Sequence, residues 1–267
     1  MEEKVTVEVT TYQAWLYTAV RIAQEAQALV QREAGLGHAV HLKGYRDPVT
    51  EVDGRANQLI LEALRAAFPE HGIHSEESAP EQDEAEVVWW VDPLDGTTNF
   101  SRGLPLFGLS LAAVRQGVPV VGVVLDGLRG ECFAAARGGG ATRDGQPLRV
   151  SGIQTLEAAM VALEWPRDNA LRYQAWQRLG RLMPQARGLR AFGSAALGMA
   201  YVAAGRLDVY FAHSLSLWDQ AAAVLLVQEA GGLVLDLQGG PWTVHTRAPL
   251  VTASPALAQA VLSSWEE

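Results

Sequence analysis

The stretch that decides the fold is WWVDPLDGTTNF, residues 89–100. It begins with large apolar residues, as a buried strand does, and then reaches two aspartates three positions apart, Asp92 and Asp95. Pro93 and the Asp95-Gly96 pair are common in turns, so a solvated turn after a strand is one explanation. An acidic site at the end of the strand is the other, and the rest of the sequence has to decide between them.

The same loop carries groups that suit both a metal ion and a phosphate. Because proline restricts the turn, both carboxylates can face one point while Leu94 offers its backbone carbonyl. Gly96 lets the backbone approach a ligand closely. Thr97 and Thr98 would present amides and hydroxyls at the start of a helical turn, which favours an anion. The loop can therefore supply metal ligands and a phosphate cradle together.

Three other acidic positions accompany this loop. They are Asp53 in DPVTEVD (47–53), Glu76 in HSEES (74–78) and Asp219 in SLWDQAA (216–222). Mg²⁺ prefers oxygen ligands, typically carboxylates together with water and substrate phosphate. Two such ions about 3.5–4 Å apart can stabilise the attacking and the leaving oxygen of a phosphoryl transfer. That chemistry needs one carboxylate that bridges the ions and further carboxylates that hold each of them.

Each of these acids also has a structural explanation. Asp53 lies three residues after Thr50, as the acid of a capping box does, and that role is compatible with catalysis. Glu76 and Glu77, between serines, are typical of a solvated turn. Asp219 precedes an alanine-rich helix, where an N-cap aspartate is the usual role. None of the six histidines has the spacing of metal ligands, so we assign none to a metal.

Helical periodicity predicts helices over 12–32 and 51–68, with a loop over 33–47 between them. Between 87 and 150, glycine and Asp-Gly turns separate apolar runs, which predicts an antiparallel meander. After 151 we expect strands at 158–165, 188–192, 207–213 and 231–237, and helices at 169–182, 195–204 and 219–230. Such alternation indicates a layered α/β or α+β protein. A composition shift near residue 150 predicts two subdomains, 1–150 and 151–267.

Composition narrows the class of protein. A chain of 267 residues that is 49% hydrophobic can bury one large core or two compact ones. No apolar run reaches the roughly 18 residues of a membrane span, and the acidic start lacks the regions of a signal peptide. The single cysteine allows no internal disulfide. We therefore expect a soluble cytoplasmic protein without a membrane partner. With a net charge of −9 and scattered arginines, we do not expect nucleic acid to be its main ligand.

Four segments, in this order, together resemble one family. DPVTEVD, HSEES, WVDPLDGTTNF and LWDQAAAVLLVQEAGG (217–232) are similar to motifs of the inositol monophosphatase family, and the resemblance spans 43–232. It implies a Mg²⁺-dependent, lithium-sensitive phosphatase that acts on small sugar or polyol phosphates. It also implies an α+β fold, a layered α-β-α-β-α sandwich of the inositol monophosphatase and fructose bisphosphatase type, usually found as a homodimer.

The resemblance also implies roles for the acidic residues. Glu76, Asp92 and the Leu94 carbonyl are similar to the ligands of a first Mg²⁺. Asp92, Asp95 and Asp219 are similar to the ligands of a second, with Asp92 bridging the two ions. A third and weaker ion of the family contacts the glutamate that holds the first. The implied cofactor is thus two to three Mg²⁺ ions per site.

The implied catalytic residues are Asp53, Glu76 and Thr97. Thr97 resembles the threonine that holds the nucleophilic water, and Asp53 the aspartate that orients that threonine. The reaction would be in-line attack of a metal-activated water on a phosphate monoester. The implied substrate-binding residues are Asp95, Gly96, Thr97, Thr98, Gly193, Ser194, Ala195 and Asp219.

The chain departs from the family pattern at the position that contacts the leaving group. Inositol-acting members carry a glutamate seven residues before the aspartate of the second signature, and Ala212 stands there in this chain. Inositol 1-phosphate is the default substrate. The alternatives with the same chemistry are fructose 1,6-bisphosphate, histidinol phosphate, a 3′-phosphoadenosine nucleotide and NADP. An alternative of another class is a regulatory binding protein on the same fold.

Overall fold

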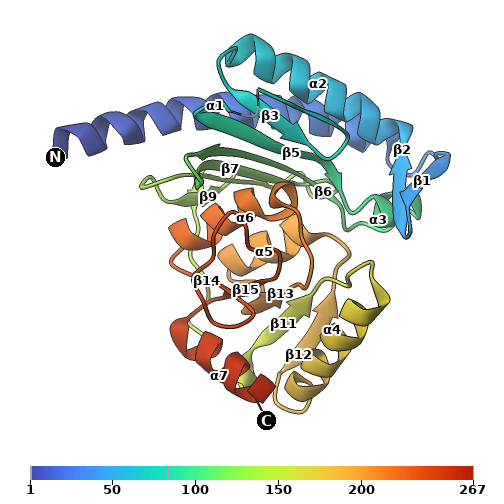
Figure 1. The fold of residues 1–267 in the computed structure, drawn as a ribbon, viewed down its shortest axis with the longest axis vertical. Helices are drawn as coiled ribbons and strands as arrows, with labels where there is room; N and C mark the ends of the chain where they lie inside the picture. The colour runs from blue at the N-terminus through green and yellow to red at the C-terminus, as the bar shows by residue number, and fades with distance from the viewer. Residues whose placement is uncertain (1, 83, 267) are drawn as a thin grey trace.

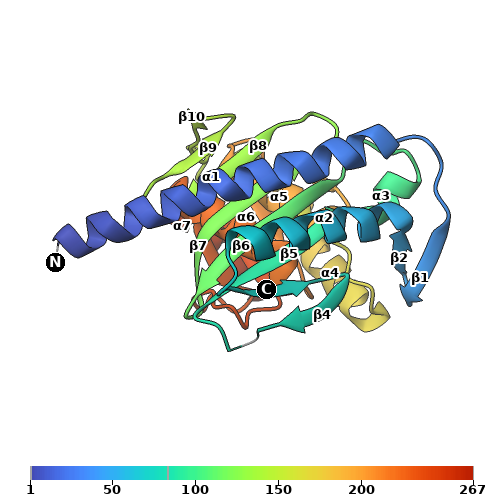
Figure 2. The ribbon, with the colours of Figure 1, turned by 90° about the horizontal axis from the view of Figure 1, so that it is seen from above.

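The computed structural model describes residues 2–82 and 84–266, with side chains from residue 8 onward. Five layers follow one another, helices alternating with sheets (Figure 1). The outer layer at the N-terminal end consists of α1 (Glu2–Glu33) and α2 (Glu51–Ala67). These two helices lie side by side across one face of the larger sheet (Figure 2).

The larger sheet has eight strands in the order β10-β9-β8-β7-β6-β5-β3-β4. From β5 to β10 each strand pairs antiparallel with the next, so the predicted meander is confirmed. β3 pairs in parallel with β5. The strands are β3 (Gly72–Ser75), β4 (Ser78–Glu81), β5 (Val87–Asp95), β6 (Gly108–Arg115), β7 (Val118–Asp126), β8 (Cys132–Ala136), β9 (Ala141–Arg143) and β10 (Gln146–Pro147).

Both faces of this sheet are buried. Ile22 of α1 and Ile60 of α2 pack against Trp89 and Leu111 on one face. On the other face, α5 (Ala195–Ala203) and α6 (Leu217–Glu229) are buried along nearly their whole length. A helix that is apolar all round belongs in a protein interior, which explains why α5 and α6 form the central layer.

The second sheet lies on the far side of α5 and α6. It has five strands in the order β12-β11-β13-β15-β14, and β11 pairs in parallel with both of its neighbours. Its outer face is covered by α4 (Asn169–Leu182) and α7 (Pro255–Glu266), which complete the predicted α-β-α-β-α sandwich. The strands are β11 (Met160–Leu163), β12 (Gly188–Ala191), β13 (Val209–Phe211), β14 (Leu233–Asp236) and β15 (Pro249–Thr252).

The structure corrects several of the predicted elements. The segment 33–47 is not simply a loop, because β1 (Val40–Gly44) and β2 (Asp47–Thr50) form an antiparallel hairpin. Every residue of β1 is exposed, so its sequence carries no buried alternation that would reveal a strand. α1 begins at Glu2 and not at residue 12. β3, β4, β15 and α7 were not among the expected elements.

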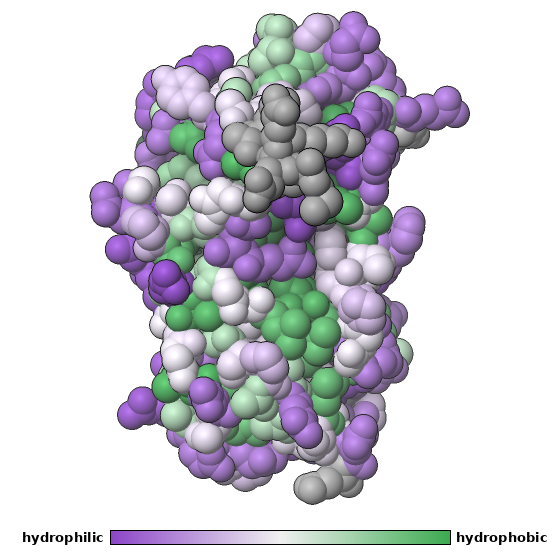
Figure 3. Space-filling model, turned by 90° about the vertical axis from the view of Figure 1, so that its left-hand side faces the viewer, coloured by the Kyte–Doolittle hydropathy of each residue, from purple (hydrophilic) through white to green (hydrophobic). Residues whose placement is uncertain are grey.

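The proposed boundary at residue 150 separates the strands of the two sheets. A single apolar cluster nevertheless joins β6, β7 and β8 to α5 and α6, so the core continues across that boundary. Among the residues that the structure describes, no helix combines the length and apolar character that a membrane span requires. One face of the molecule shows hydrophilic residues around separate apolar areas (Figure 3).

Candidate metal and phosphate site

The site begins where β5 ends. β5 and β6 are in register up to Asp92 and Ser110, and the pairing shifts before Asp95 and Gly108, so the strand bends between the two aspartates. The Leu94 amide donates to Asp92 Oδ1 at 3.0 Å and fixes that carboxylate in the bend. The predicted helical turn follows as α3 (Thr97–Ser101).

Gly96 is the hinge between the strand and α3. Its φ is +93°, in the left-handed region that favours glycine. A Cβ at this position would lie 2.9 Å from the Leu106 carbonyl oxygen and 3.0 Å from that of Gly193. Only glycine therefore lets the loop pass this close to the segment that precedes α5.

Thr97 and Asp53 form a hydrogen-bonded pair at the start of α3. Thr97 Oγ1 lies 2.9 Å from Asp53 Oδ1 and 3.0 Å from the Leu94 carbonyl oxygen. The other oxygen of Asp53 accepts from the Thr50 amide at 2.9 Å and from the Thr50 hydroxyl at 2.5 Å. Thr50 and Asp53 form the predicted capping box of α2, so one carboxylate joins the helix cap to Thr97.

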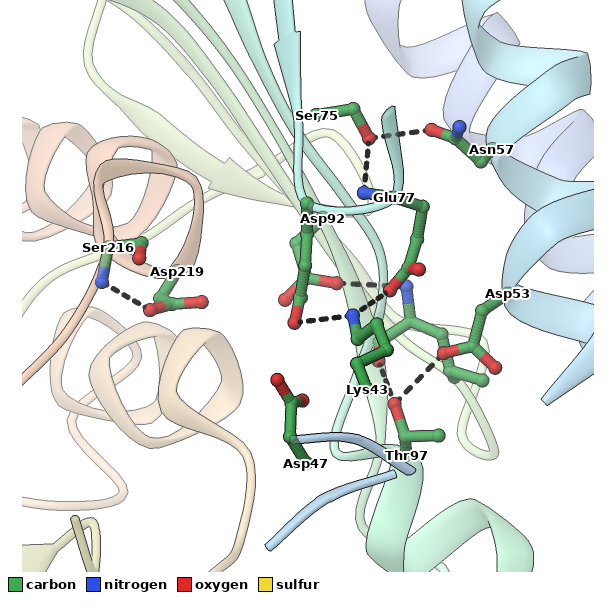
Figure 4. A network of polar contacts seen from close by, with 12 residues as sticks. Lys43, Asp47, Asp53, Asn57, Ser75, Glu77, Asp92, Thr97, Ser216 and Asp219 are labelled. Atoms are coloured by element: carbon green, nitrogen blue, oxygen red, sulfur yellow. Dashed lines mark hydrogen bonds and ion pairs between the residues drawn. The ribbon is translucent and has the colours of Figure 1, made fainter. Parts of the chain in front are cut away.

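Three carboxylates meet beside this pair. One ligand oxygen from each of Glu76, Asp92 and Asp219 lies within 4.8 Å of the others. They come from the turn between β3 and β4, from β5 and from the first turn of α6. Asp92 and Asp219 point toward one another from opposite sides (Figure 4). Three anionic oxygens at this separation form a donor set that fits a hard divalent cation.

The structure also tests the structural explanations for Glu76, a solvated turn, and for Asp219, a helix N-cap. Glu76 is half-buried, and its amide donates to the Val91 carbonyl oxygen at 3.1 Å, so this turn is held against β5. Asp219 is not the N-cap of its helix. Ser216 is the N-cap, and its amide donates to Asp219 Oδ2 at 2.6 Å in a capping box.

Asp95 faces a different neighbour. Its oxygens accept from the Ser194 hydroxyl at 2.6 Å and from the amides of Ala196 and Ala195 at 2.7 and 3.2 Å. The carboxylate therefore lies at the N-terminus of α5, where the helix dipole stabilises negative charge. The structure brings Asp95 to the segment of Gly193, but does not place it in the cluster of three. Its role as a metal ligand stays a prediction.

Asn99 links the predicted substrate-binding segments. Its side-chain amide donates to the carbonyl oxygens of Leu106 and Phe192 at 2.6 Å each. Gly193 has a φ of +71°, and a Cβ there would lie 2.8 Å from Asn99 Nδ2. The loop around Gly96 and the segment 193–195 therefore lie together. Thr98 is exposed at the same end of α3.

Burial raises the pKa of three aspartates at this site, Asp92, Asp95 and Asp219. The pKa of Asp92 is well above its usual range because of burial and the nearby charges of Glu76, Asp95 and Asp219. Burial, followed by the charges of Asp95 and Glu76, raises the pKa of Asp219 to about 8. Burial raises the pKa of Asp95 to about 6, although its hydrogen bonds to the start of α5 oppose the shift. The site thus concentrates negative charge that a cation would stabilise.

We expect the free energy of unfolding of the metal-free protein to fall as pH rises from about 4 to about 8. A carboxyl whose pKa is higher in the folded than in the unfolded state keeps a proton that unfolding releases, so its contribution is lost over that interval. Mg²⁺ should therefore raise the Tm more at about pH 8 than at about pH 5, because it replaces protons. Thermal unfolding with Mg²⁺ and with EDTA measures this.

Asp219→Asn should remove much of the extra rise in Tm that Mg²⁺ gives at about pH 8, because it deletes a carboxyl whose pKa is raised. The matched control is Asp144→Asn, which changes an exposed aspartate on the turn after β9. An equal Mg²⁺ effect at both pH values would contradict the assignment of the cluster as a cation site.

Two cations and one acid at this site were not expected from the sequence. Lys43 Nζ lies 3.2 Å from Glu76 Oε1 and also pairs with Glu77, and Arg167 lies 3.7 Å from the same Glu76 oxygen. No motif indicates either cation, because both reach the cluster from distant segments. The acid is Glu164, whose pKa is raised to about 8 by burial and by the charges of Asp95 and Asp219. An acidic residue directly after the apolar run MVAL was its one signal.

The fold and site define a layered α-β-α-β-α protein with a carboxylate cluster that can hold a divalent metal ion. The inositol monophosphatase family matches residues 11–267, and the chain belongs to that family. A Nus factor SuhB of Pseudomonas aeruginosa is 44% identical over 85% of this chain and 87% of its own length.

Solved structures are similar over almost the whole chain. An extragenic suppressor protein SuhB of Bartonella henselae has a TM-score of 0.91 and 35% identity, covering 95% of this chain and 99% of its own. A Thermotoga maritima IMPase has a TM-score of 0.88 and 31% identity, covering 95% and 97%. The fold expected from the family resemblance is therefore confirmed.

Proposed function

We propose that this protein is a Mg²⁺-dependent, lithium-sensitive phosphomonoesterase that acts on a small sugar or polyol monophosphate, with inositol 1-phosphate as the default substrate. One observation carries the proposal. The carboxylates of Glu76, Asp92 and Asp219 converge within 4.8 Å of one another, next to a threonine held by a buried aspartate. Membership of the inositol monophosphatase family supports the same chemistry.

In the proposed mechanism, bound metal and the residues of the chain have different roles. Bound Mg²⁺ would supply Lewis-acid stabilisation of charge on the phosphate and leaving oxygens. Glu76, Asp92, Asp219 and the Leu94 carbonyl would hold it, together with Asp95. The chain's own contribution is positioning and electrostatic preorganisation.

In this proposal Thr97 orients a water molecule. A hydroxyl has one proton, and the Asp53 carboxylate 2.9 Å away is the stronger acceptor for it. With its proton directed to Asp53, Thr97 Oγ1 keeps its lone pairs free to accept a hydrogen bond from water. A water held in this way turns a lone pair of its own oxygen away from Thr97, toward a phosphorus bound in the loop. The amides of Gly96 and Thr97 would receive the phosphate oxygens.

Phosphate release from a panel of monoesters tests the function. The panel contains inositol 1-phosphate, fructose 1,6-bisphosphate, histidinol phosphate, a 3′-phosphoadenosine nucleotide and NADP, each with Mg²⁺ and with EDTA. We expect release that requires Mg²⁺, fastest with a monophosphate of a polyol. If no panel member is hydrolysed under either condition, the proposed activity is wrong.

A second candidate function has an observation of its own. Several relatives, including one from Escherichia coli that is 40% identical over 94% of this chain, are Nus factors SuhB. That name partly conflicts with our expectation that nucleic acid is not a main ligand, since it points to a transcription complex. We propose a regulatory binding role as an additional function, located on the surface and independent of the metal site. The Asp92 variant discussed below separates the two roles.

A further inference from the structure

Glu164 is a carboxylate that the proposed chemistry does not use. It directly follows β11, and its amide donates to the Phe211 carbonyl oxygen of β13 at 3.2 Å, which continues the ladder of the two parallel strands. Since Leu163 is opposite Phe211, Glu164 comes opposite Ala212. Of these two neighbouring positions, only 164 carries a carboxylate.

The alternation of β11 and β13 determines which way this carboxylate faces. Val161, Leu163 and Phe211 pack in the outer core beneath α4 and α7. Ala162 and Ala212 pack in the central core with α5 and α6. Successive side chains of a strand point to opposite faces, so Glu164 shares the face of Ala162. That face is covered by α5, whose first backbone amides donate to Asp95, and by α6, whose first turn includes Asp219.

Glu164 and Tyr210 both leave a polar atom unpaired. Among the described residues, Glu164 Oε2 and the Tyr210 hydroxyl are buried without a hydrogen-bond partner. The charges of Asp95 and Asp219 act on both groups, so both lie close to the proposed site. Buried polar groups in proteins are normally hydrogen-bonded, and an orphan calls for an explanation such as a ligand.

We propose that Glu164 is a specificity-determining residue whose carboxylate accepts a hydrogen bond from a hydroxyl of the substrate's leaving group. The assignment rests on the proposed phosphatase function and narrows its substrate class. The Glu164 carboxyl can accept hydrogen bonds from neutral hydroxyls at its unpaired Oε2, and in its ionised form it repels phosphate. The leaving group beside Glu164 is therefore a neutral polyol, and a substrate that would place a second phosphate next to Glu164 is excluded. Tyr210 supplies a hydroxyl from the adjacent strand.

Glu164→Gln and Glu164→Ala test the assignment with two substrates. The leaving group of inositol 1-phosphate carries hydroxyls that Glu164 could accept from, and that of p-nitrophenyl phosphate carries none. We expect kcat/KM for inositol 1-phosphate to fall by about 10- to 100-fold, the size of a lost hydrogen bond to a charged acceptor. For p-nitrophenyl phosphate it should change by less than about threefold. Glu229→Gln is the matched control, because Glu229 is half-buried and accepts the Gly138 and Gly140 amides far along α6.

The double variant Glu164→Ala/Ala212→Glu returns a carboxylate from the neighbouring strand. Recovery of the preference for inositol 1-phosphate in this variant would support the assignment. An equal fall with both substrates would show a structural role for Glu164 and would overturn the proposal. Unchanged kinetics with both substrates would overturn it as well.

A binding measurement separates this proposal from the proposed activity. Calorimetry with a non-hydrolysable inositol phosphonate and Mg²⁺ reports affinity whether or not the protein turns over a substrate. If the wild type hydrolyses nothing but Glu164→Gln binds the phosphonate more weakly than the wild type does, the role of Glu164 is supported and the proposed activity is rejected. Equal affinity of the two proteins would reject the role of Glu164.

Discussion

Asp92→Asn is expected to lower Mg²⁺-dependent phosphate release by at least roughly 10³-fold, which is about 4 kcal/mol of transition-state stabilisation. The carboxylate is buried, 1% exposed, and it faces both Glu76 and Asp219. Asparagine keeps the shape and an oxygen that can accept from the Leu94 amide. It removes the charge through which this position would hold a metal ion.

The same substitution should raise the Tm of the metal-free protein. Burial and neighbouring carboxylates raise the pKa of Asp92, so a neutral side chain relieves an unfavourable concentration of charge. Mg²⁺ should then stabilise the variant less than the wild type. Opposite effects on activity and on metal-free stability would show that the loss of turnover is not a loss of folding.

Asp208→Asn is the matched control for Asp92→Asn. Asp208 is buried, 5% exposed, and its carboxylate accepts from the Ser151 hydroxyl and the Met160 amide, away from the cluster. Its replacement should reduce stability and leave kcat near the wild-type value. Near-normal turnover by Asp92→Asn would instead reject the metal assignment. Under the second candidate function, capture of a transcription complex should survive Asp92→Asn, because the regulatory role would not use the metal.

The parts of the site that could be predicted from the sequence are the local ones. Asp92, Asp95 and Gly96 lie within five residues, where a strand meets a turn, so their chemistry is visible in one motif. The capping box of Thr50 and Asp53 is equally local, and the structure confirms it. Local geometry of this kind follows from turn and cap preferences without knowledge of the tertiary fold.

The parts that could not be predicted depend on contacts between distant segments. Lys43 reaches Glu76 only because the β1–β2 hairpin forms, and β1 is exposed throughout. Glu164 lies near Asp95 and Asp219 only because β11 and β13 pair in parallel, although α4, β12 and α5 separate them in the sequence. The family resemblance identified the acids that such contacts assemble, but it gave no account of a carboxylate at position 164.

The helix boundaries show the same division. The expected helix 169–182 coincides with α4, whose N-cap is Asp168. α6 begins at Leu217, two residues before the expected start, because Ser216 and not Asp219 forms its N-cap. Both residues suit a helix N-terminus, and which of the two becomes the N-cap depends on the backbone amide that each side chain reaches.

Thr97→Val is the second substitution with a large expected effect, a fall in kcat of roughly 10²- to 10³-fold with KM changed little. Valine has nearly the volume of threonine but no hydroxyl, so Asp53 Oδ1 loses the contact at 2.9 Å and a water loses its acceptor. Thr97→Ser keeps the hydroxyl and should retain most of the activity. Ser101→Ala is the control within α3, because that hydroxyl bonds only to the Thr98 carbonyl oxygen in the described chain.

Asp53→Asn should impair the same step, and combining it with Thr97→Val shows whether the two act as a unit. The asparagine side chain of this variant would still cap α2 in part, at a cost of about 1 kcal/mol in the free energy of unfolding. If Asp53 acts through Thr97, the double variant should be about as slow as the slower single variant, because the second change removes nothing further. Fully additive losses in kcat would show that the two residues act independently. A rise in KM with unchanged kcat for Thr97→Val would place the hydroxyl in substrate binding and leave the water without its proposed holder.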